Sequence, residues 1–339
     1  MHIWVLTDGK AGDLQPCLGV AGRLADILRF EQQNVTIEER VVDPKAPWVW
    51  FMPYGPVNPF TKLDTPDDPL RPPFPDIAIA SGRRAVAYLR SLKQRAPDCL
   101  TVFLKDPMTG HTAADLIWVP GHDQLRGPNV LVSDTGPHRI SQAMLLEKRT
   151  NPLPQIAHLP QPRLSIVLGG PARKTIYSPE DVSNLAKALE PLAAQAGSLL
   201  ITGSRRTPKI WLEALAQIIE SKPGIVWTSA SEMPNPYLDF LANADALVVT
   251  GDSHNMISEA LATGVPLYLF APKKLSPKLT AFLKAVYAHK LALPLDKTTR
   301  QALELKPQEP IDSSATIAQE IRKKLNARNA SATREMNGN

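Results

Sequence analysis

Three polar side chains recur at helical spacing in one stretch of the chain. Asp252, Asn255 and Glu259 stand at positions i, i+3 and i+7, directly after the apolar run 247–250. This spacing puts them on one face of a helix that follows a buried strand. The amides at a helix N-terminus favour an anion, and a carboxylate further along can accept hydrogen bonds from hydroxyl groups. The stretch is typical of a nucleotide-sugar site, and equally of a capped helix with a solvated polar face.

The same helix carries the other candidates for this site. Asp252 or Ser253 offers a side-chain oxygen as the N-cap, and Met256 and Ser258 follow within the predicted helix. The segment 263–266, Thr-Gly-Val-Pro, ends it. We expect the start of this helix to hold the phosphates of a ligand.

Small or basic residues follow three other predicted strands in the second half of the chain, at 169–174, 203–206 and 228–229. Glycine lets a phosphate approach the backbone, and arginine or lysine neutralises its charge. Because parallel strands end at one edge of a sheet, these loops are expected to meet. We interpret them as a diphosphate site, with routine turn chemistry as the alternative for any single loop. The predicted phosphate-binding residues are Gly169, Gly170, Arg173, Gly203, Ser204 and Arg205.

The first half offers candidates for a general base, which an inverting sugar transfer needs. Asp13 follows Gly12 at the start of the first predicted helix, where an N-cap is the commonest explanation. Asp8 lies in the same loop, and His122 precedes Asp123 in a short turn. A capped turn is the alternative for His122, since neighbours in sequence usually point apart. We take Asp13 as the first candidate, with His122 and Asp8 in reserve.

Strands and helices alternate along the chain, so the candidates above fall at strand ends. This alternation is typical of the α/β class and predicts two tandem Rossmann-like, doubly wound domains that face each other across a cleft. The predicted strands are 3–6, 35–42, 76–80, 100–104, 116–119, 129–132, 164–168, 199–202, 225–228, 247–250 and 267–270. Ser178 is predicted to cap a helix that begins at Pro179, since Glu180 and Asp181 follow in its first turn. The run Asn235-Pro236-Tyr237 could place a ring or an amide against a nucleotide base, but helix initiation is the favoured explanation for Tyr237.

Proline-rich segments mark the predicted domain boundaries. Residues 151–162 hold four prolines and are predicted to link an N-terminal domain at 1–150 to a C-terminal domain at 163–312. Residues 313–327 are predicted to form a last amphipathic helix, and the tail after it is expected to fray. Residues 43–75 contain ten prolines and several aromatic residues. This long loop either packs on its domain or contacts an amphipathic or lipid-linked acceptor.

Composition and missing motifs exclude several classes. The 339 residues carry a net charge of +5, and Lys and Arg are dispersed, so nucleic-acid binding is not expected. No apolar run reaches transmembrane length, and the chain enters a strand at once. This predicts a cytoplasmic protein, peripheral at most at the inner face of the membrane. No C-x-x-C or H-E-x-x-H occurs, so no metal is expected. The lack of G-x-G-x-x-G and of a P-loop argues against NAD-dependent and P-loop enzymes.

Several motifs together resemble the mitochondrial fission family, that of the plant elongated-mitochondria protein and its bacterial homologues. The resemblance covers roughly residues 1–290 and is most specific at 252–266. The family is viewed as similar to GT-B glycosyltransferases, which implies two domains of the kind expected above. The motifs are Thr7-Asp8-Gly9-Lys10-Ala11-Gly12, Ser81-Gly82-Arg83-Arg84, Pro120-Gly121-His122-Asp123, Gly127-Pro128-Asn129-Val130, Leu168-Gly169-Gly170, Asn235-Pro236-Tyr237 and the stretch 250–266.

The segment 258–266 also looks like the donor site of the peptidoglycan N-acetylglucosaminyltransferase that makes lipid II. There the residue matching Glu259 binds the ribose of a UDP-sugar, so the resemblance implies a UDP-type donor. Relatives often carry His or Asn where this chain has Asp13, and an acidic residue is expected where it has Gly251.

The resemblance implies a metal-independent glycosyltransferase that uses a nucleotide-diphosphate sugar as substrate and needs no cofactor. Its partners would be that nucleotide sugar and an acceptor, for which a membrane- or lipid-linked molecule is one option. The alternative is a non-catalytic, GT-B-shaped scaffold that acts through protein contacts, as the plant member's role in fission suggests.

Overall fold

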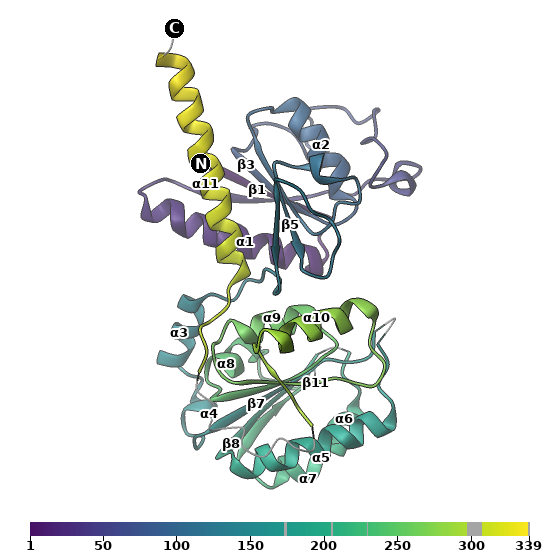
Figure 1. Cartoon of the computed structure of the whole chain (residues 1–339), viewed down its shortest axis with the longest axis vertical. Coiled ribbons are helices and arrows are strands. Elements are labelled where there is room, and N and C mark those ends of the chain that lie inside the picture. Colours follow the sequence, from purple (N-terminus) through teal and green to yellow (C-terminus); the bar gives the residue numbers. More distant parts are fainter. Residues whose placement is uncertain (173–174, 205, 229, 297–306, 338–339) are drawn as a thin grey trace. The chain divides into compact units, whose positions relative to one another are not determined.

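The computed structural model divides into two compact units, each built around one parallel sheet (Figure 1). Unit 1 comprises Met1–Arg139 and Ser313–Asn339, and unit 2 comprises Ile140–Asp312. The structure describes residues 1–172, 175–204, 206–228, 230–296 and 307–337, with side chains up to residue 330.

Unit 1 contains a six-stranded sheet in the order β2-β1-β3-β4-β5-β6. Its inner strands are fully buried, as short apolar runs predict for a parallel sheet covered on both faces. Ile3 pairs with Ile37 on one side and with Ile77 on the other, which sets the register around β1. The strands are β1 (His2–Thr7), β2 (Thr36–Val41), β3 (Ile77–Ser81), β4 (Leu100–Leu104), β5 (Leu116–Pro120) and β6 (Val130–Ser133).

Helices cover both faces of this sheet. Successive residues of a strand point to opposite sides, so each buried strand contributes apolar side chains to both faces. Ile3 and Val5 share one buried cluster with residues of α1 and α11. Trp4 and Leu6 lie in a second cluster with residues of α2. The helical elements are α1 (Ala11–Phe30), α2 (Ala85–Arg95), α11 (Ser313–Asn337) and two 3-10 turns, η1 (Trp48–Phe51) and η2 (His111–Ala113).

Unit 2 repeats this design with the strand order β12-β11-β10-β7-β8-β9. Most of its strands match the predicted ranges to within a residue at each end. They are β7 (Arg163–Leu168), β8 (Ser198–Gly203), β9 (Gly224–Trp227), β10 (Ala246–Thr250), β11 (Leu267–Phe270) and β12 (Leu293–Pro294).

The helices of unit 2 also lie on both sides of its sheet. Ile166 packs with the α5 side chains, whereas Val167, the next residue, packs with α9 and α10. Ser178 caps α5 as predicted, in a capping box with Asp181. The helices are α3 (Gln142–Thr150), α4 (Pro154–Ala157), α5 (Pro179–Gln195), α6 (Lys209–Ala214), α7 (Ala216–Glu220), α8 (Tyr237–Ala242), α9 (His254–Leu261) and α10 (Pro277–Ala288).

In each sheet the chain changes direction beside the first strand of that unit. β1 lies between β2 and β3, and β7 lies between β8 and β10. The connections therefore leave these strands toward opposite sides, and open α/β sheets bind ligands at the carboxyl ends of such a pair. The pair is β1 and β3 in unit 1, and β7 and β10 in unit 2. Asp8 and Asp13 follow β1, Gly169 and Gly170 follow β7, and the residues from Asp252 to Glu259 follow β10.

The division between the units differs from the predicted one. It falls after Arg139, so α3, which was expected in the N-terminal domain, belongs to unit 2. Arg149 near the end of α3 fixes this helix, because its Nε donates to the Ala242 carbonyl over 2.6 Å. The placement is a matter of side-chain contacts that the sequence pattern does not reveal.

The predicted linker, residues 151–162, is packed on unit 2. It contains the short helix α4, and Ile156 is fully buried there in a cluster with Phe240. The Ser198 hydroxyl also donates to the Pro160 carbonyl over 2.6 Å. One apolar side chain among the prolines is enough to anchor the segment.

The C-terminal helix α11 packs against α1 and belongs to unit 1 (Figure 1). Ile317, Ile321 and Leu325 lie in the same core cluster as Ile3. The helix continues to Asn337, so the expectation of a frayed tail from residue 328 was wrong. No proline or glycine interrupts the sequence between these positions.

Candidate functional site

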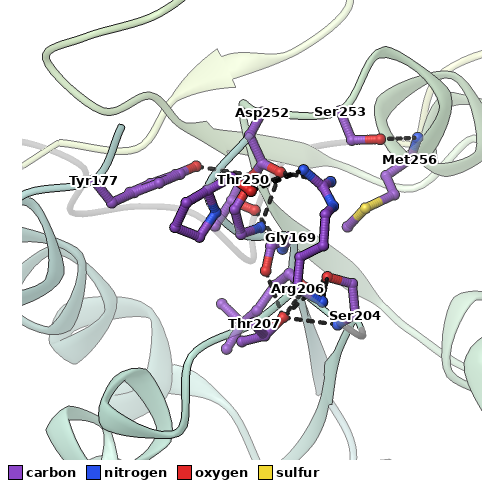
Figure 2. Close-up of polar contacts among 12 residues, drawn as sticks. Gly169, Tyr177, Ser204, Arg206, Thr207, Thr250, Asp252, Ser253 and Met256 are labelled. Atoms are coloured by element: carbon purple, nitrogen blue, oxygen red, sulfur yellow. Dashed lines mark hydrogen bonds and ion pairs between the residues drawn. The ribbon is translucent and has the colours of Figure 1, made fainter. Parts of the chain in front are cut away.

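Asp252 is the centre of a hydrogen-bond network at the carboxyl edge of the second sheet (Figure 2). Its carboxylate accepts from the Gly170 amide at 2.9 Å, from the Tyr177 hydroxyl at 2.9 Å and from Arg206 Nη2 at 3.1 Å. The side chain has no exposed surface, and a buried carboxylate is destabilising unless donors surround it. Burial and the Asp252 charge raise the pKa of Tyr177, so its hydroxyl keeps the proton that it donates. Asp252 is therefore a positioning residue rather than a ligand contact.

Gly169 and Gly170 are required by close packing at this edge. The Gly169 amide donates to Thr250 Oγ1 at 2.7 Å, and the Gly170 amide donates to Asp252. A Cβ on Gly169 would lie 2.2 Å from Asp252 Oδ2, and a Cβ on Gly170 would lie 2.2 Å from the Arg206 carbonyl oxygen. Both amides are occupied, so they do not offer the phosphate contacts that the sequence predicted.

Thr207 fixes the loop after β8. Its Oγ1 contacts the Leu168 and Gly169 carbonyl oxygens and accepts from the Ser204 amide at 2.8 Å. A Cβ on Gly203 would lie 3.1 Å from Thr207 Cβ. Gly203 and Ser204 were predicted to bind phosphate, and here they shape the loop. The Ser-x-x-Thr spacing of positions 204 and 207 was the sequence signal for this turn.

Arg206 is the basic side chain that the structure places at this edge. Its Nη1 donates to the Gly170 carbonyl at 3.1 Å and its Nη2 to Asp252, while 43% of the side chain stays exposed. The sequence contains an arginine pair at 205–206, of which Arg205 was predicted to bind phosphate. Arg205 and Arg173 both lie outside the described residues.

The start of α9 lies beside this arginine. Ser253 caps the helix as predicted, since its Oγ accepts from the Met256 amide at 3.3 Å. Asn255 is exposed and Met256 is half-buried. A helix N-terminus carries partial positive charge. Asp252, which accepts a hydrogen bond from Arg206, directly precedes the N-cap residue Ser253. The helix start and the half-exposed guanidinium therefore lie at the same edge of the sheet.

Glu259 lies further along α9 and contacts the start of α8. Its Oε2 accepts from the Tyr237 hydroxyl at 2.6 Å, and no described residue donates to Oε1. Burial raises the pKa of Glu259, and the hydrogen bond from Tyr237 offsets only part of this effect. Burial and the Glu259 charge in turn raise the pKa of Tyr237. One carboxylate oxygen is thus held in place while the other can accept from a ligand hydroxyl.

Two further candidates on these helices have structural roles. Ser258 was predicted to lie in the ligand site; it is fully buried, and its Oγ donates to the His254 carbonyl at 2.9 Å. Tyr237 begins α8, as helix initiation predicted, and its amide donates to Asn235 Oδ1 at 3.0 Å. Its hydroxyl nevertheless reaches Glu259, a contact that the sequence did not reveal.

Asp13 meets two donors at the carboxyl edge of the first sheet. Its Oδ1 accepts from Ser81 Oγ at 2.9 Å and from Lys105 Nζ at 2.6 Å. Gly82 has a φ of +92°, and a Cβ there would lie 3.0 Å from Asp13 Oδ2, so only glycine fits this turn. The N-cap of α1 is Lys10, so the capping explanation for Asp13 was wrong. One oxygen of Asp13 is fixed, and no described residue donates to the other.

The two reserve bases lie at the same edge, but no described contact joins either of them to Asp13. Asp8 pairs with Lys10; burial raises the pKa of Asp8, yet the hydrogen bonds and charge of Lys10 outweigh this and hold it below its usual range. His122 Nε2 lies 3.9 Å from Asp123 Oδ1, so these neighbours do approach each other. The lowered pKa makes the Asp8 carboxylate a weaker proton acceptor than an ordinary aspartate, although it is deprotonated and could act as a base.

The described ranges contain neither a metal cluster nor a membrane-spanning helix. No group of three or more His, Cys, Asp or Glu side chains in this part of the chain is arranged to hold a metal ion. None of its helices is both long enough and apolar enough to cross a bilayer. Cys17 and Cys99 are buried and form no disulfide.

Two solved structures share the fold over nearly the whole chain. The UDP-GlcNAc 2-epimerase from Methanocaldococcus jannaschii has a TM-score of 0.54 and 12% identity, covering 96% of this chain and 100% of that one. A second structure, of a UDP-N-acetylglucosamine 2-epimerase, has a TM-score of 0.53 and 10% identity, covering 98% and 97%. Identities this low show the fold alone. They confirm the predicted class, α/β with two Rossmann-like sheets of the GT-B type.

Sequence comparison identifies relatives in bacteria and plants. Uncharacterized protein RP120 of Rickettsia prowazekii (strain Madrid E) is 25% identical over 356 residues, covering 95% of this chain and 98% of that protein. Mitochondrial fission protein ELM1 of Arabidopsis thaliana is 26% identical over 279 residues, covering 75% of this chain and 65% of the plant protein. The chain thus spans just under two thirds of the length of its plant relative. The family model for mitochondrial fission ELM1 matches residues 11–325, and the chain therefore belongs to the mitochondrial fission ELM1 family.

Proposed function

We propose that this protein is a metal-independent glycosyltransferase that uses a nucleotide-diphosphate sugar as donor. The observation that carries the proposal is the meeting of three features around α9. The half-exposed Arg206 is held beside a helix start capped by Ser253, and the Glu259 carboxylate follows on the same helix. A cation and a helix N-terminus suit a diphosphate, and a carboxylate oxygen suits a sugar or ribose hydroxyl.

Asp13 is the candidate base in this proposal. Ser81 and Lys105 hold its Oδ1, which orients the carboxylate, and its Oδ2 would take the proton of the acceptor hydroxyl. A fixed carboxylate loses little entropy when it reaches the transition state. The acceptor is proposed to be amphipathic or lipid-linked, because the segment 43–75 exposes large aromatic side chains.

Donor binding is the first experiment. Isothermal titration of the full chain with UDP, GDP, dTDP, CMP and ADP sugars, without added divalent metal, should give saturable binding of one nucleotide class. We place UDP sugars first because both solved structures described above are, by name, enzymes of a UDP sugar. Glu259→Ala should weaken binding about tenfold or more, the effect of losing a hydrogen bond to a charged acceptor.

A matched control uses Lys209→Ala, which removes a charge from the same unit. Lys209 is 89% exposed, and its ion-pair partner among the described residues is Glu213 at 3.8 Å, so this variant should bind the donor like the unaltered protein. No binding of any nucleotide sugar, or equal affinities for the Glu259→Ala and Lys209→Ala variants, would refute the proposed site.

A nucleotide-binding scaffold without turnover is the second candidate. The observation that favours it is the set of aromatic side chains in segment 43–75, where Trp50 is 72% and Phe60 is 83% exposed. Exposed aromatic residues are enriched in protein contact surfaces. Donor binding without hydrolysis or transfer, together with a partner whose capture is lost in Trp50→Ala and Phe60→Ala, would favour this candidate over the enzyme.

A further inference from the structure

An open pocket of about 770 Å³ lies in unit 1. It is lined by residues of the edge strand β2 and of the proline-rich segment 43–75, and by Tyr88 of α2. Its volume falls within the range of pockets that bind small molecules. Neither the candidate base Asp13 nor any residue of unit 2 lines it.

Arg40 forms the floor of this pocket and is only 7% exposed. Its guanidinium stacks on the Trp4 ring, with Cζ 4.3 Å from the ring centre. Glu38 Oε1 lies 2.9 Å from Arg40 Nε, yet neither Nε nor Nη1 makes an aligned hydrogen bond to a described residue. Nη2 is not among these enclosed atoms, so it is the nitrogen that faces the pocket. Because Nη2 has no hydrogen-bond partner among the described residues, it can donate to an acceptor in the pocket.

Tyr88 supplies a second unused donor. The side chain is 6% exposed and lines the same pocket, and no described residue hydrogen-bonds to its hydroxyl. Burial, and then the charges of Asp43 and Asp68, raise the pKa of Tyr88, so its hydroxyl stays protonated and can donate at neutral pH.

The wall formed by segment 43–75 is held firmly to α2. Arg90 Nη2 donates to the carbonyls of Pro53, Tyr54 and Gly55, at 2.9, 3.1 and 2.9 Å. Arg95 Nη1 donates to Asp68 at 2.8 Å. The pocket is therefore built by specific contacts of two arginines.

The lining of the pocket carries four acidic and four basic side chains, so the contacts of each group decide where an anion can bind. The acidic side chains Glu38 and Asp43 already face cations of the wall. Lys62 and Arg71, in contrast, have no carboxylate partner among the described residues, and the two other acidic side chains of the lining are exposed to solvent. Lys62 and Arg71 thus add two cations without a carboxylate partner to the pocket that also contains Arg40 and Tyr88.

We propose that this pocket binds a small polar molecule through a carboxylate or phosphate group, which Arg40 Nη2 and the Tyr88 hydroxyl hold. Arginine and a phenol donate together to the oxygens of such a group, and a guanidinium can contact two of them. The rest of the pocket, with charges of both signs, accommodates a polar body. This site does not depend on the proposed glycosyl transfer.

The Trp4 indole is the reporter for the experiment, because it is fully buried and touches the Arg40 guanidinium. The full chain, labelled with ¹⁵N-tryptophan, is titrated with citrate, inorganic pyrophosphate or glucose at constant pH and ionic strength. Trp4→Phe assigns the signal. Citrate, pyrophosphate or both should shift the Trp4 indole signal to saturation, and glucose should not. The two anions distinguish a carboxylate from a phosphate ligand.

Tyr88→Phe removes only the hydroxyl and should weaken anion binding about fivefold, the effect of one hydrogen bond. Lys62→Glu, at an exposed side chain, should weaken it further without affecting folding. Tyr54→Phe is the matched control, since Tyr54 is 66% exposed and does not line the pocket. The proposal is overturned if neither anion shifts the Trp4 signal, if glucose shifts it equally, or if Tyr88→Phe binds like Tyr54→Phe.

Discussion

The Tyr237 hydroxyl donates to Glu259 Oε2 over 2.6 Å and so joins the first residue of α8 to α9. The bond orients a carboxylate that burial would otherwise disfavour in its charged form. The same contact leaves the second oxygen available to a ligand. Glu259 therefore affects both the stability of unit 2 and the proposed binding of a ligand. Its effect on stability can be followed through the pH dependence of unfolding.

Glu259→Gln should change how stability depends on pH. Because the folded pKa of Glu259 is raised, the folded protein holds this proton at pH values where the unfolded chain has lost it. The contribution of Glu259 to the free energy of unfolding is thus greatest below about pH 4.3, the usual value for Glu. It falls as pH rises through the raised folded pKa. Urea unfolding from pH 4 to 8 should show the unaltered protein losing stability relative to the variant over that window.

Glu213→Gln is the control for this pH profile. Glu213 is 60% exposed and pairs only with the exposed Lys209. Its difference from the unaltered protein should be flat over the same range, and a flat difference for Glu259→Gln as well would contradict the assigned burial effect.

Asp252→Asn should destabilise unit 2. The substitution removes the charge that accepts from Gly170, Tyr177 and Arg206, and places an amide N–H among donors. We expect a loss of about 2 kcal/mol in the free energy of unfolding by urea denaturation. Asp245→Asn is the comparison, because Asp245 also accepts from a backbone amide but is exposed, and it should cost well under about 1 kcal/mol. Equal losses for the two variants would show that the network is not the stabilising feature.

Two glycines of α1 should respond to alanine with opposite signs. A Cβ on Gly19 would lie 2.1 Å from the His138 carbonyl oxygen, a backbone atom that cannot move away cheaply. A Cβ on Gly22 meets nothing within 4 Å. Gly19→Ala should therefore lower the melting temperature, and Gly22→Ala should stabilise by roughly 0.5–1 kcal/mol, the helix preference for alanine. Stabilisation by both substitutions would contradict the packing described for α1.

Asp13→Asn should separate donor binding from turnover. The amide can keep the hydrogen bond from Ser81 but cannot take a proton, so sugar transfer or donor hydrolysis should fall by roughly 100-fold or more. Calorimetry should show unchanged nucleotide affinity, since no unit 2 residue is altered. Asp26→Asn, at a side chain 67% exposed, is the control. If Asp13→Asn retains its turnover, a residue other than Asp13 must act as the base.

Local structure was largely predictable from the sequence. The strand at 100–104 matches β4 residue for residue, and the Ser178 cap of α5 was expected from the Ser-Pro-Glu-Asp run at positions 178–181. Such features depend on apolar runs and on contacts a few residues apart, which the sequence displays directly. The family motifs likewise identified the correct strand ends.

The polar network of the site was less predictable, because its partners are far apart in sequence. Gly170 and Asp252 are 82 positions apart, and the sequence of neither loop indicates that the Gly170 amide will donate to the Asp252 carboxylate. Glycines at a strand end were therefore assigned to phosphate when they serve packing. Tyr237 was likewise recognised as a helix start, whereas its hydroxyl contact is tertiary.

The position of α11 gives the chain an unusual order of assembly. Ile317, Ile321 and Leu325 fill the core of unit 1 together with Ile3 and Val5 of β1, which precede them by almost the whole described chain. Unit 2 is a continuous segment and emerges complete from the ribosome before α11 does. The first half of the protein must therefore wait, with part of its core missing, until the last helix is released.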